Sequence, residues 1–563
     1  MITDATVQSA IDIFQQSPVE AESTVAYESA GNVLIIANSL KVEQLLVQLS
    51  DNLHPAILFT DQCRPKLADT LQKAKIPYLN QVENIGIQGF MGQFHVTADY
   101  QFADNSESSK QVKDNQNSHN EHEPGEGQFL LIHQLTEVVF DLVVDLQPLP
   151  AINVALPPPG YFSLANHSEQ LDHVLQDLSD WIGVFDKPKY YDYIAPRCAH
   201  SANSIISCTQ CIEHCPTQAI ESHNGQIVVD PYLCQGCGDC ATTCPSGAMV
   251  YRYPSVNQMQ DQLRKGLDAY YRAGGVKPVL LLYSQESASD WLQDNSHKLP
   301  AGTIPCTVES IAAYGLDTWL AALAYGASSI ILLSTDDDLP ISMVLLDQQI
   351  AVLNTILQGI GITACPVQRC ASDQLDHITL AYIQLSGRAT FSGIEDKRRM
   401  IRLAVEFLQQ GYSDQPAFQT LPKNALFGEV VVESDRCTLC MSCVSICPQG
   451  ALLSGENLPQ LKFLELNCVQ CGLCENACPE SVISLNPRYI YDDELARTPR
   501  LLHEDEVIAC VHCGKPFIGA QMLASMFEKM ADHPMYQGSQ RSLLQMCGDC
   551  RVIALHSKQT EKN

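Results

Sequence analysis

The stretch CTLCMSCVSICP, from Cys437 to Pro448, decides how residues 425 to 490 fold. Its four cysteines follow the spacing C-x2-C-x2-C-x3-C-P, and the stretch CVQCGLCENACP, from Cys468 to Pro479, repeats that spacing. Three cysteines two residues apart place three thiolates on one tight loop, while the fourth lies just beyond it. The repeat therefore predicts one module built from two matching halves.

This spacing is typical of proteins that hold two [4Fe–4S] clusters. Each cluster there is bound by three cysteines of one half and by the last cysteine of the other half. Each cluster then ties the two halves together. We therefore assign the eight cysteines to two ligand sets, which are Cys437, Cys440, Cys443 and Cys478, and Cys468, Cys471, Cys474 and Cys447.

An earlier module, residues 196 to 252, follows the same plan with one departure. Ile205 stands where the spacing requires the first cysteine, and Cys198, ten residues before Cys208, can loop back to replace it. Without Cys198 the site would hold a [3Fe–4S] cluster or use a ligand other than cysteine. His200 and His214 are expected to face solvent without a role. The two predicted sets are Cys234, Cys237, Cys240 and Cys215, and Cys208, Cys211, Cys244 and Cys198.

Two further Cys-x2-Cys pairs lie in residues 505 to 555. Four thiolates suit tetrahedral zinc and leave no open position for chemistry. We prefer a structural zinc site in a zinc-ribbon-like tail over a single iron, a fifth cluster or two independent dithiol pairs. The four predicted metal ligands are Cys510, Cys513, Cys547 and Cys550.

The remaining sequence alternates short apolar runs with helical patterns. Residues 33–36, 56–59, 279–283 and 330–333 read as buried strands, and such alternation is typical of α/β structure. A further short strand is expected around Ile362, and Asp317 is expected to N-cap a helix that Gly326 ends. The predicted fold class is a multidomain α/β and α+β protein, with two dicluster ferredoxin-like modules inserted among α/β domains. The predicted segments are an α/β domain at 1–150 with a disordered insert at 105–128, a Pro-rich linker and helix at 151–195, the module at 196–252, an α/β domain at 275–395, the module at 425–490 and the tail at 505–555.

Charge and cysteine content narrow the class of partner. The chain has 563 residues, 34 Lys plus Arg and 64 Asp plus Glu, which gives a net charge of −30. Such a balance argues against nucleic acid as the main partner and fits docking against a basic patch on a redox partner protein. The start has no export signal and the longest apolar stretch, 319–333, is interrupted, so we expect no membrane span and a reducing cytoplasm for the 24 cysteines.

No catalytic residue is predicted. Outside the cysteine sets we find no Ser–His–Asp, HExxH or paired-carboxylate arrangement, and no glycine-rich nucleotide fingerprint follows a strand. The sequence therefore favours an electron-transfer component without its own substrate site, although whether the chain is an enzyme stays open.

Several short stretches along the chain carry a resemblance to a known family. They are Phe140–Leu142, Pro158–Tyr161, Lys187–Pro188, Cys198–His200, Cys234–Cys240 and Met546–Val552. In these stretches the chain resembles cytoplasmic multi-cluster iron–sulfur proteins of proteobacteria that are found beside formate dehydrogenase genes. The resemblance implies an electron-transfer protein with up to four [4Fe–4S] clusters that serves a formate dehydrogenase-type enzyme as redox partner or subunit. The alternative is a non-catalytic accessory or maturation scaffold for such a molybdenum or tungsten enzyme.

Overall fold

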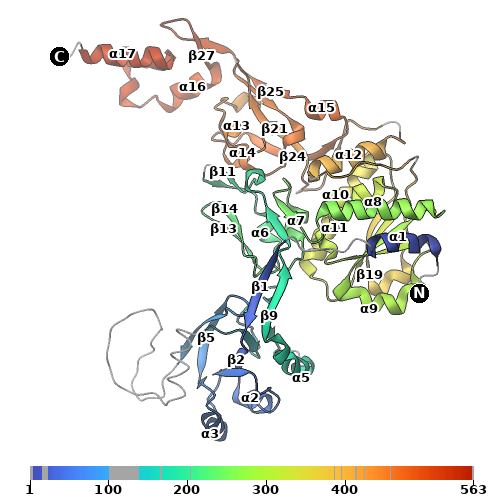
Figure 1. Ribbon diagram of the computed structural model, residues 1–563. Helices are drawn as coiled ribbons and strands as arrows, with labels where there is room; N and C mark the ends of the chain where they lie inside the picture. Colours follow the sequence, from blue (N-terminus) through green and yellow to red (C-terminus); the bar gives the residue numbers. More distant parts are fainter. Residues whose placement is uncertain are drawn as a thin grey trace, which may run out of the picture.

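The computed structural model describes residues 4–15, 23–100, 139–164 and 168–560, apart from 203, 386, 395, 413–414, 424 and 457. The predicted insert at 105–128 lies outside the described residues. Figure 1 shows an elongated molecule with the first α/β domain (blue) at one end and the C-terminal tail (red) at the other. The two cysteine modules lie between them, and the second α/β domain is at their side.

The first domain is built on a five-stranded parallel sheet. Its strand order is β4 (Tyr78–Leu79), β3 (His54–Phe59), β2 (Asn32–Ala37), β7 (Leu142–Asp145) and β8 (Tyr161–Ser163). The apolar runs of β2 and β3 are buried on both faces, as the sequence predicted, because alternate side chains enter two cores. Helices α2 (Ser39–Leu45), α3 (Pro65–Ala74) and α5 (Ser168–Asp177) cover one face, and the β5–β6 hairpin (Val82–Gln88, His95–Tyr100) covers the other.

Residues 151–195 do more than link two domains. Strand β8 completes the first sheet, and α5 packs on its core through Leu175. Strand β9 (Gly183–Pro188) then pairs antiparallel with β1 (Thr24–Ser29) and leads into the first module. The Pro-rich segment contacts both units, because Leu156 N–H donates to the Pro216 carbonyl oxygen and the Pro159 carbonyl oxygen accepts from Met91 N–H.

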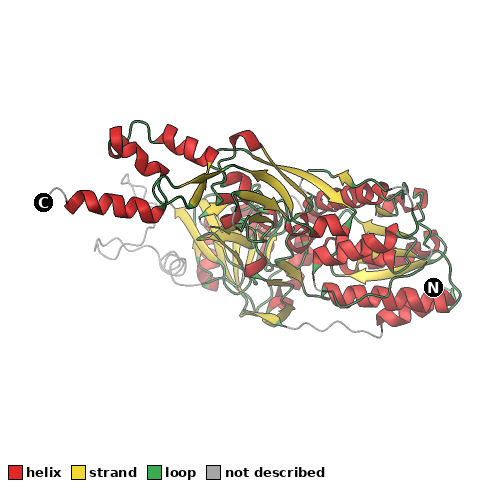
Figure 2. Cartoon of the chain, turned by 90° about the horizontal axis from the view of Figure 1, so that it is seen from above, coloured by secondary structure: helices red, strands yellow, loops and turns green. Residues whose placement is uncertain are grey.

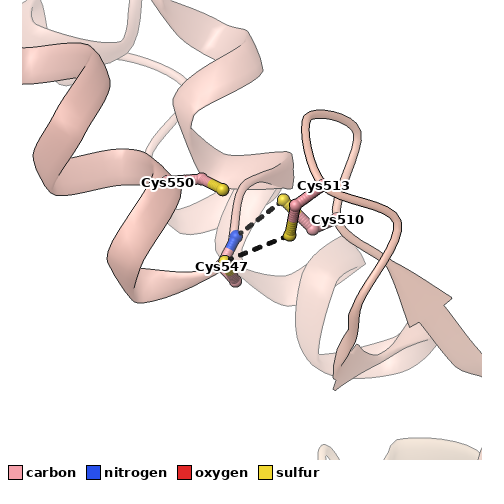
Figure 3. Close-up of side chains that lie close together, drawn as sticks. All are labelled: Cys510, Cys513, Cys547 and Cys550. Atoms are coloured by element: carbon pink, nitrogen blue, oxygen red, sulfur yellow. Dashed lines mark hydrogen bonds between the residues drawn. The ribbon is translucent and has the colours of Figure 1, made fainter.

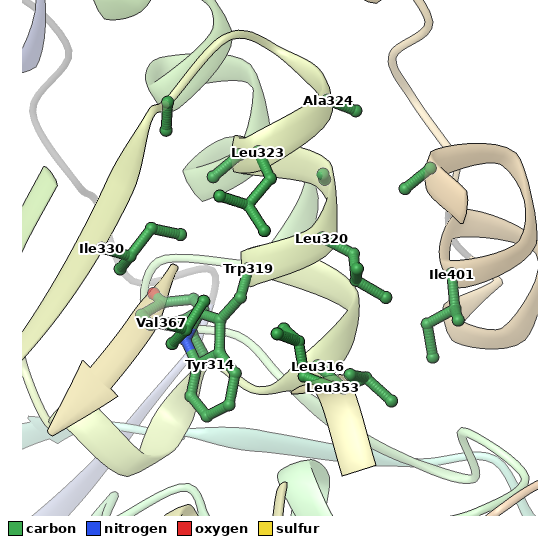
Figure 4. Close-up of a cluster of buried hydrophobic side chains, with 14 of the residues drawn as sticks. Tyr314, Leu316, Trp319, Leu320, Leu323, Ala324, Ile330, Leu353, Val367 and Ile401 are labelled. Carbon is green, nitrogen blue, oxygen red and sulfur yellow. The ribbon is translucent and has the colours of Figure 1, made fainter. Parts of the chain in front are cut away.

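The second α/β domain has a four-stranded parallel sheet. The order is β17 (Thr303–Val308), β16 (Val279–Ser284), β18 (Ser329–Ser334) and β19 (Val367–Ala371). Helices α8 (Val256–Arg272), α9 (Gln285–Asn295), α10 (Leu316–Ala324), α11 (Pro340–Gly359) and α12 (Lys397–Gln409) surround it. Figure 4 shows the largest core, in which Trp319 and Leu323 of α10 face the sheet and Ile401 of α12 lies opposite Leu320.

Two local predictions in this domain were wrong. The last strand occupies Val367–Ala371, whereas we predicted it around Ile362, which follows the end of α11. The N-cap of α10 is Gly315, and the predicted cap Asp317 lies buried in the first turn. Asp317 is thus not the N-cap residue, although its carboxylate interacts with the N–H groups of Asp317 and Thr318 as well as with Lys397.

Helix α1 (Ala5–Gln15) belongs with the second α/β domain and not with the first. It packs along α8, with Val7 and Ala10 in the large core and Phe14 so close to Gly266 that a Cβ there would meet the ring at 2.7 Å. A glycine in the middle of α8 thus makes room for a helix that is far away in sequence.

Helix α11 is the one candidate membrane span in the part of the chain that the structure describes. It qualifies by length and composition alone, and apolar core helices meet the same test. Leu346, Leu353, Ile356 and Leu357 of α11 lie in the core, so its apolar character is explained by packing.

Each module joins short antiparallel strands with helices of about one turn. The first contains β10 (Tyr191–Tyr193), β11 (Ser201–Ala202), β12 (Ile205–Ile206), β13 (Ile220–His223), β14 (Gln226–Val229), β15 (Met249–Tyr251), α6 (Gln210–Glu213) and α7 (Asp239–Thr243). The second contains β20 (Phe418–Thr420), β21 (Gly428–Val432), β22 (Leu452–Ser454), β23 (Gln460–Phe463), β24 (Ile483–Ile490), β25 (Arg500–Glu504), α13 (Ser442–Ile446), α14 (Leu473–Asn476) and α15 (Asp493–Arg497). The tail has β26 (Val507–Ala509), β27 (Pro516–Gly519), α16 (Ala520–Lys529) and α17 (Gly548–Thr560), and Figure 2 shows α17 projecting from the body.

Candidate metal centres

Three of the four predicted ligand sets each surround a cavity of their own. In every case the distal cysteine comes from the opposite half of the module, as the spacing predicts. One cavity is lined by Cys437, Cys440, Cys443 and Cys478, a second by Cys447, Cys468, Cys471 and Cys474, and a third by Cys215, Cys234, Cys237 and Cys240. The ligand roles of these cysteines stay predictions, but the structure gathers them as those roles require.

The short helices explain how each loop points its thiols inward. Cys211, Cys240, Cys443 and Cys474 each lie on one of these helices, α6, α7, α13 and α14. Three of the helices follow a residue in the left-handed region, namely Gly238, Met441 and Gly472, which reverses the chain abruptly. The reversal lets successive sulfurs face one centre.

The chemistry of the cavities fits an iron–sulfur cluster. Apolar side chains line them beside the cysteines, for example Leu461 and Ile483 in one and Leu452 and Leu485 in another. Burial raises the pKa of Cys443 and of Cys471 to about 12, so bare thiolates there would be costly. A cationic iron centre supplies the positive charge that four buried thiolates need.

The fourth set is also brought together, with Cys198 in it. Burial, together with the nearby Cys244 and Cys198, raises the pKa of Cys208 to about 11. The pKa of Cys211 is raised in the same way to about 12, with Cys244, Cys208 and Cys198 as neighbours. The β11–β12 hairpin turns the chain back between Cys198 and Cys208, and Ile205 is used as its returning strand. This turn explains how a cysteine ten residues upstream reaches the set.

His200 corrects one sequence expectation. It is only 2% exposed, whereas we expected it to face solvent. Its Nδ1 lies 2.8 Å from the Cys208 carbonyl oxygen and its Nε2 lies 2.7 Å from Ser222 Oγ. His200 therefore fixes the loop that carries Cys208. His214, also expected to face solvent, is partly buried, with Nδ1 2.9 Å from the Gln210 carbonyl oxygen.

The four sets follow one another in a row. Within the first module Cys211 is a charge neighbour of Cys240, and within the second Cys443 is a neighbour of Cys474. The two modules meet where Cys208 of one set approaches Cys471 of another. The row therefore runs from the Cys234 set through the Cys208 and Cys468 sets to the Cys437 set.

Direct hydrogen bonds hold the two modules together at the middle of this row. Ser207 Oγ donates to the Cys471 carbonyl oxygen at 2.6 Å and accepts from Asn476 Nδ2 at 3.1 Å. Gln449 Nε2 donates to the Arg197 carbonyl oxygen at 2.9 Å. Both contacts involve residues next to predicted ligands, so the junction fixes the two central sets against each other.

Comparison with known proteins agrees with this geometry. Two family patterns, each described as a 4Fe-4S dicluster domain, match residues 206–248 and 429–479. The chain therefore carries two ferredoxin-type dicluster domains. Iron–sulfur electron transfer is the function that such domains supply. Cys198 lies outside the matched residues, so its ligand role stays a prediction from the sequence that its proximity to Cys208 and Cys211 supports.

Individual relatives match short parts of the chain. A ferredoxin-type protein NapH of Haemophilus influenzae is 27% identical over 82 residues, which is 14% of this chain and 29% of the relative. An uncharacterized ferredoxin of Methanocaldococcus jannaschii is 40% identical over 58 residues, 10% of this chain and 32% of the relative. A subunit I of NAD(P)H-quinone oxidoreductase from Gloeobacter violaceus is 28% identical over 113 residues, 16% and 54%. The chain thus spans about a third of the first two relatives and about half of the third.

Three basic side chains outside the dicluster loops donate to carbonyl oxygens of those loops. Lys187 Nζ donates to Tyr232 at 3.1 Å and to Cys234. Lys397 Nζ donates to Ala241 at 3.0 Å, to Thr242, and to Cys244 at 3.4 Å. Arg398 donates to Leu466 at 3.1 Å, to Cys468 at 2.9 Å, and to Leu426.

Sequence reasoning assigned these three residues no role. Both side chains are partly buried, and burial lowers the pKa of the Lys397 ammonium and lowers that of the Arg398 guanidinium to about 10. The run Lys397-Arg398-Arg399 in so acidic a chain was the one signal that could have drawn attention to two of them.

The tail cysteines form a tighter group than the four sets. Figure 3 shows Cys510 and Cys513 on one loop facing Cys547 and Cys550 at the start of α17, and the four sulfurs all lie within 4.8 Å of one another. Cys513 Sγ and Cys547 Sγ are 3.8 Å apart, and the edge of a sulfur tetrahedron around zinc is also about 3.8 Å for Zn–S bonds of about 2.3 Å. Burial opposes ionisation of Cys510, but N–H groups of Cys513, Cys547 and His512 lower its pKa to about 6. The group is thus suited to a single metal ion.

Proposed function

We propose that the four sets bind four [4Fe–4S] clusters and that the chain conducts electrons along the row they form. Each cluster would accept and release one electron when bound. The observation that carries the proposal is the junction at Ser207, which places the Cys208 set beside the Cys468 set and so connects the two modules. Two separate carriers on one chain would not need this contact.

The ends of the row differ in access to solvent. Cys440 is exposed, so the Cys437 set is open to a docking protein. At the other end Tyr190, Tyr191 and Tyr251 line the cavity of the Cys234 set, and the Pro157 carbonyl oxygen accepts a hydrogen bond from Gln235. The Cys437 end is therefore the proposed point of exchange with a partner.

The partner we propose is a formate dehydrogenase-type molybdenum or tungsten enzyme in the cytoplasm. The resemblance in the stretches around Phe140, Pro158 and Met546 supports this choice, and the net charge of −30 supports docking on a basic surface. We also propose that the tail binds zinc. The separation of 3.8 Å between Cys513 Sγ and Cys547 Sγ supports zinc over a multi-iron cluster.

Metal analysis with EPR tests the cluster content. Four cubanes predict about sixteen iron atoms per chain and as much sulfide, with signals that appear on reduction by dithionite. Anaerobically purified protein that has little iron, or iron that cannot be reduced, would contradict an electron-transfer role.

A deletion strain separates the carrier from the maturation scaffold. For a carrier, the partner enzyme keeps its activity with artificial electron acceptors and loses only transfer to its physiological partner. A partner enzyme that is present but inactive with artificial acceptors would favour the scaffold.

A further inference from the structure

The start of α12 contacts both modules through two consecutive residues. Lys397 donates to carbonyl oxygens around Cys244 in the first module, and Arg398 donates to the carbonyl oxygen of Cys468 in the second. One helix end thus contacts the two sets that meet at the junction. Neither basic residue lies within a dicluster motif.

Both side chains are held as cations. Three carbonyl oxygens surround Lys397 Nζ, and only an ammonium has three N–H groups to donate. Arg398 keeps its charge at any physiological pH and also lies 4.3 Å above the Phe427 ring. Carbonyl oxygens and an aromatic face solvate these cations but bring no negative charge.

The charges are not neutralised by an ion pair. Among the described residues, neither Lys397 nor Arg398 forms an ion pair within 4.0 Å, although Asp317 acts on Lys397 and Asp396 acts on Arg398 from farther away. An unpaired cation removed from water is costly unless a buried negative charge compensates it. For Lys397 the buried Asp317 supplies part of that charge, and the group that Cys244 and Cys240 would help to hold supplies more. For Arg398 the first such group is the one that Cys468 would help to hold, since a cubane with four thiolates is net negative.

We propose that Lys397 and Arg398 are fixed counter-charges for the clusters at the module junction and raise their reduction potentials. This inference rests on the proposed function. One added electron makes the site more negative without making or breaking a bond, so a nearby cation in a low dielectric favours the reduced state. Both are positioning residues, since they act through the cysteine loops.

The Cys437 set has a different electrostatic environment. Its cationic neighbour Lys529 is exposed and paired with Glu480 at 2.6 Å, so solvent and the carboxylate screen it. A cluster there has the lower potential of the two in the second module. An electron that a redox partner delivers at the exposed end is therefore drawn toward the junction.

Redox titration followed by EPR tests the proposal on the full chain. Lys397→Met and Arg398→Gln remove the charge, Lys397→Arg and Arg398→Lys keep it, and Arg399→Met removes an exposed charge from the same helix as a control. In each charge-removing variant we expect the EPR signal of one cluster to titrate at a lower potential. At a fixed potential the ratio of reduced to oxidised cluster should fall at least tenfold, which equals a shift of about 59 mV for one electron. The charge-keeping variants and Arg399→Met should titrate like the wild type.

Iron content is measured on the same samples. Unchanged potentials in both charge-removing variants, with iron retained, overturn the proposal. Loss of iron in the charge-removing variants alone supports it, because the clusters then need the counter-charge to form. Loss of iron in the charge-keeping variants as well overturns it, because the role would then be geometric. The proposed function is judged separately, since it fails only if the wild type lacks reducible clusters.

Discussion

Cys198 illustrates how a cysteine outside the motif spacing can lie with a predicted ligand set. The motif position is Ile205, yet Cys198 lies with Cys208, Cys211 and Cys244 because the β11–β12 hairpin turns the chain back. The Tyr193 hydroxyl interacts with its thiol, which adds a contact from outside the loop. A serine at this position would keep the size of the side chain and lose the soft thiolate.

We therefore predict that Cys198→Ser damages one cluster and spares three. Iron should fall by about four atoms per chain if the cluster is lost, or by about one if a [3Fe–4S] cluster remains. Iron analysis and EPR of the oxidised protein distinguish the two cases. Cys365→Ser is the control, because Cys365 lies outside all four sets, and an unchanged spectrum for Cys198→Ser would remove it from the ligands.

Some functional residues were beyond sequence reasoning because they act across long distances in the chain. The cysteine spacing located the sets, since all thiols of a set lie within one module. Lys397 contacts Ala241 from more than 150 residues away, and no local pattern encodes such a contact. His200 was misjudged for a related reason, because its burial depends on Ser222 of a different hairpin.

At the level of secondary-structure elements, the sequence predicted the strands whose formation depends on a local run of apolar residues. The apolar runs became β2, β3, β16 and β18, because a strand buried on both faces needs an unbroken apolar segment. The packing of α1 on α8 was not predicted, since the sequence of an amphipathic helix does not determine which surface its apolar face packs against. The same limit explains why Asp317, a plausible cap by type, lies buried near Lys397 instead.

The turn before α7 carries a prediction about how the first module docks on the second α/β domain. Gly238 has φ +84°, and a Cβ there would overlap the backbone of Ala313. Gly238→Ala should lower the temperature at which visible cluster absorbance is lost and reduce iron, because it adds a clash to the backbone strain. The strain itself costs about 1–2 kcal/mol, and overpacking adds about 1–3 kcal/mol.

Gly274→Ala is the matched control for this prediction. Gly274 has φ +92° and nothing within 4 Å of an added Cβ, so it carries the strain without the clash. Equal loss of thermal stability in both variants would mean that the close contact between Gly238 and the Ala313 backbone does not limit stability.

On the scale of the whole molecule, the C-terminal tail is separate from the row of four cysteine sets. Its own core is small and consists of Cys510, Cys547 and Cys550 with Phe517 and Met546 packed against them. The ion pair from Lys529 to Glu480 joins it to the second module, and a pair with an exposed lysine contributes little stability. We therefore expect the tail to depend on a bound metal ion for its fold.

Cys513→Ser should therefore remove one zinc ion per chain and leave the iron content unchanged. Structural zinc contributes about 10–16 kcal/mol of apparent binding free energy in small zinc-folded peptides, so its loss should unfold the tail and expose α16 and α17 to proteases. Zinc and iron are measured together by mass spectrometry, and limited proteolysis reports the fold of the tail. Loss of about one iron without zinc would instead identify a single-iron site, and loss of about four would identify a fifth cluster. Retention of all metals would show that Cys513, the exposed member of the group, is not a ligand.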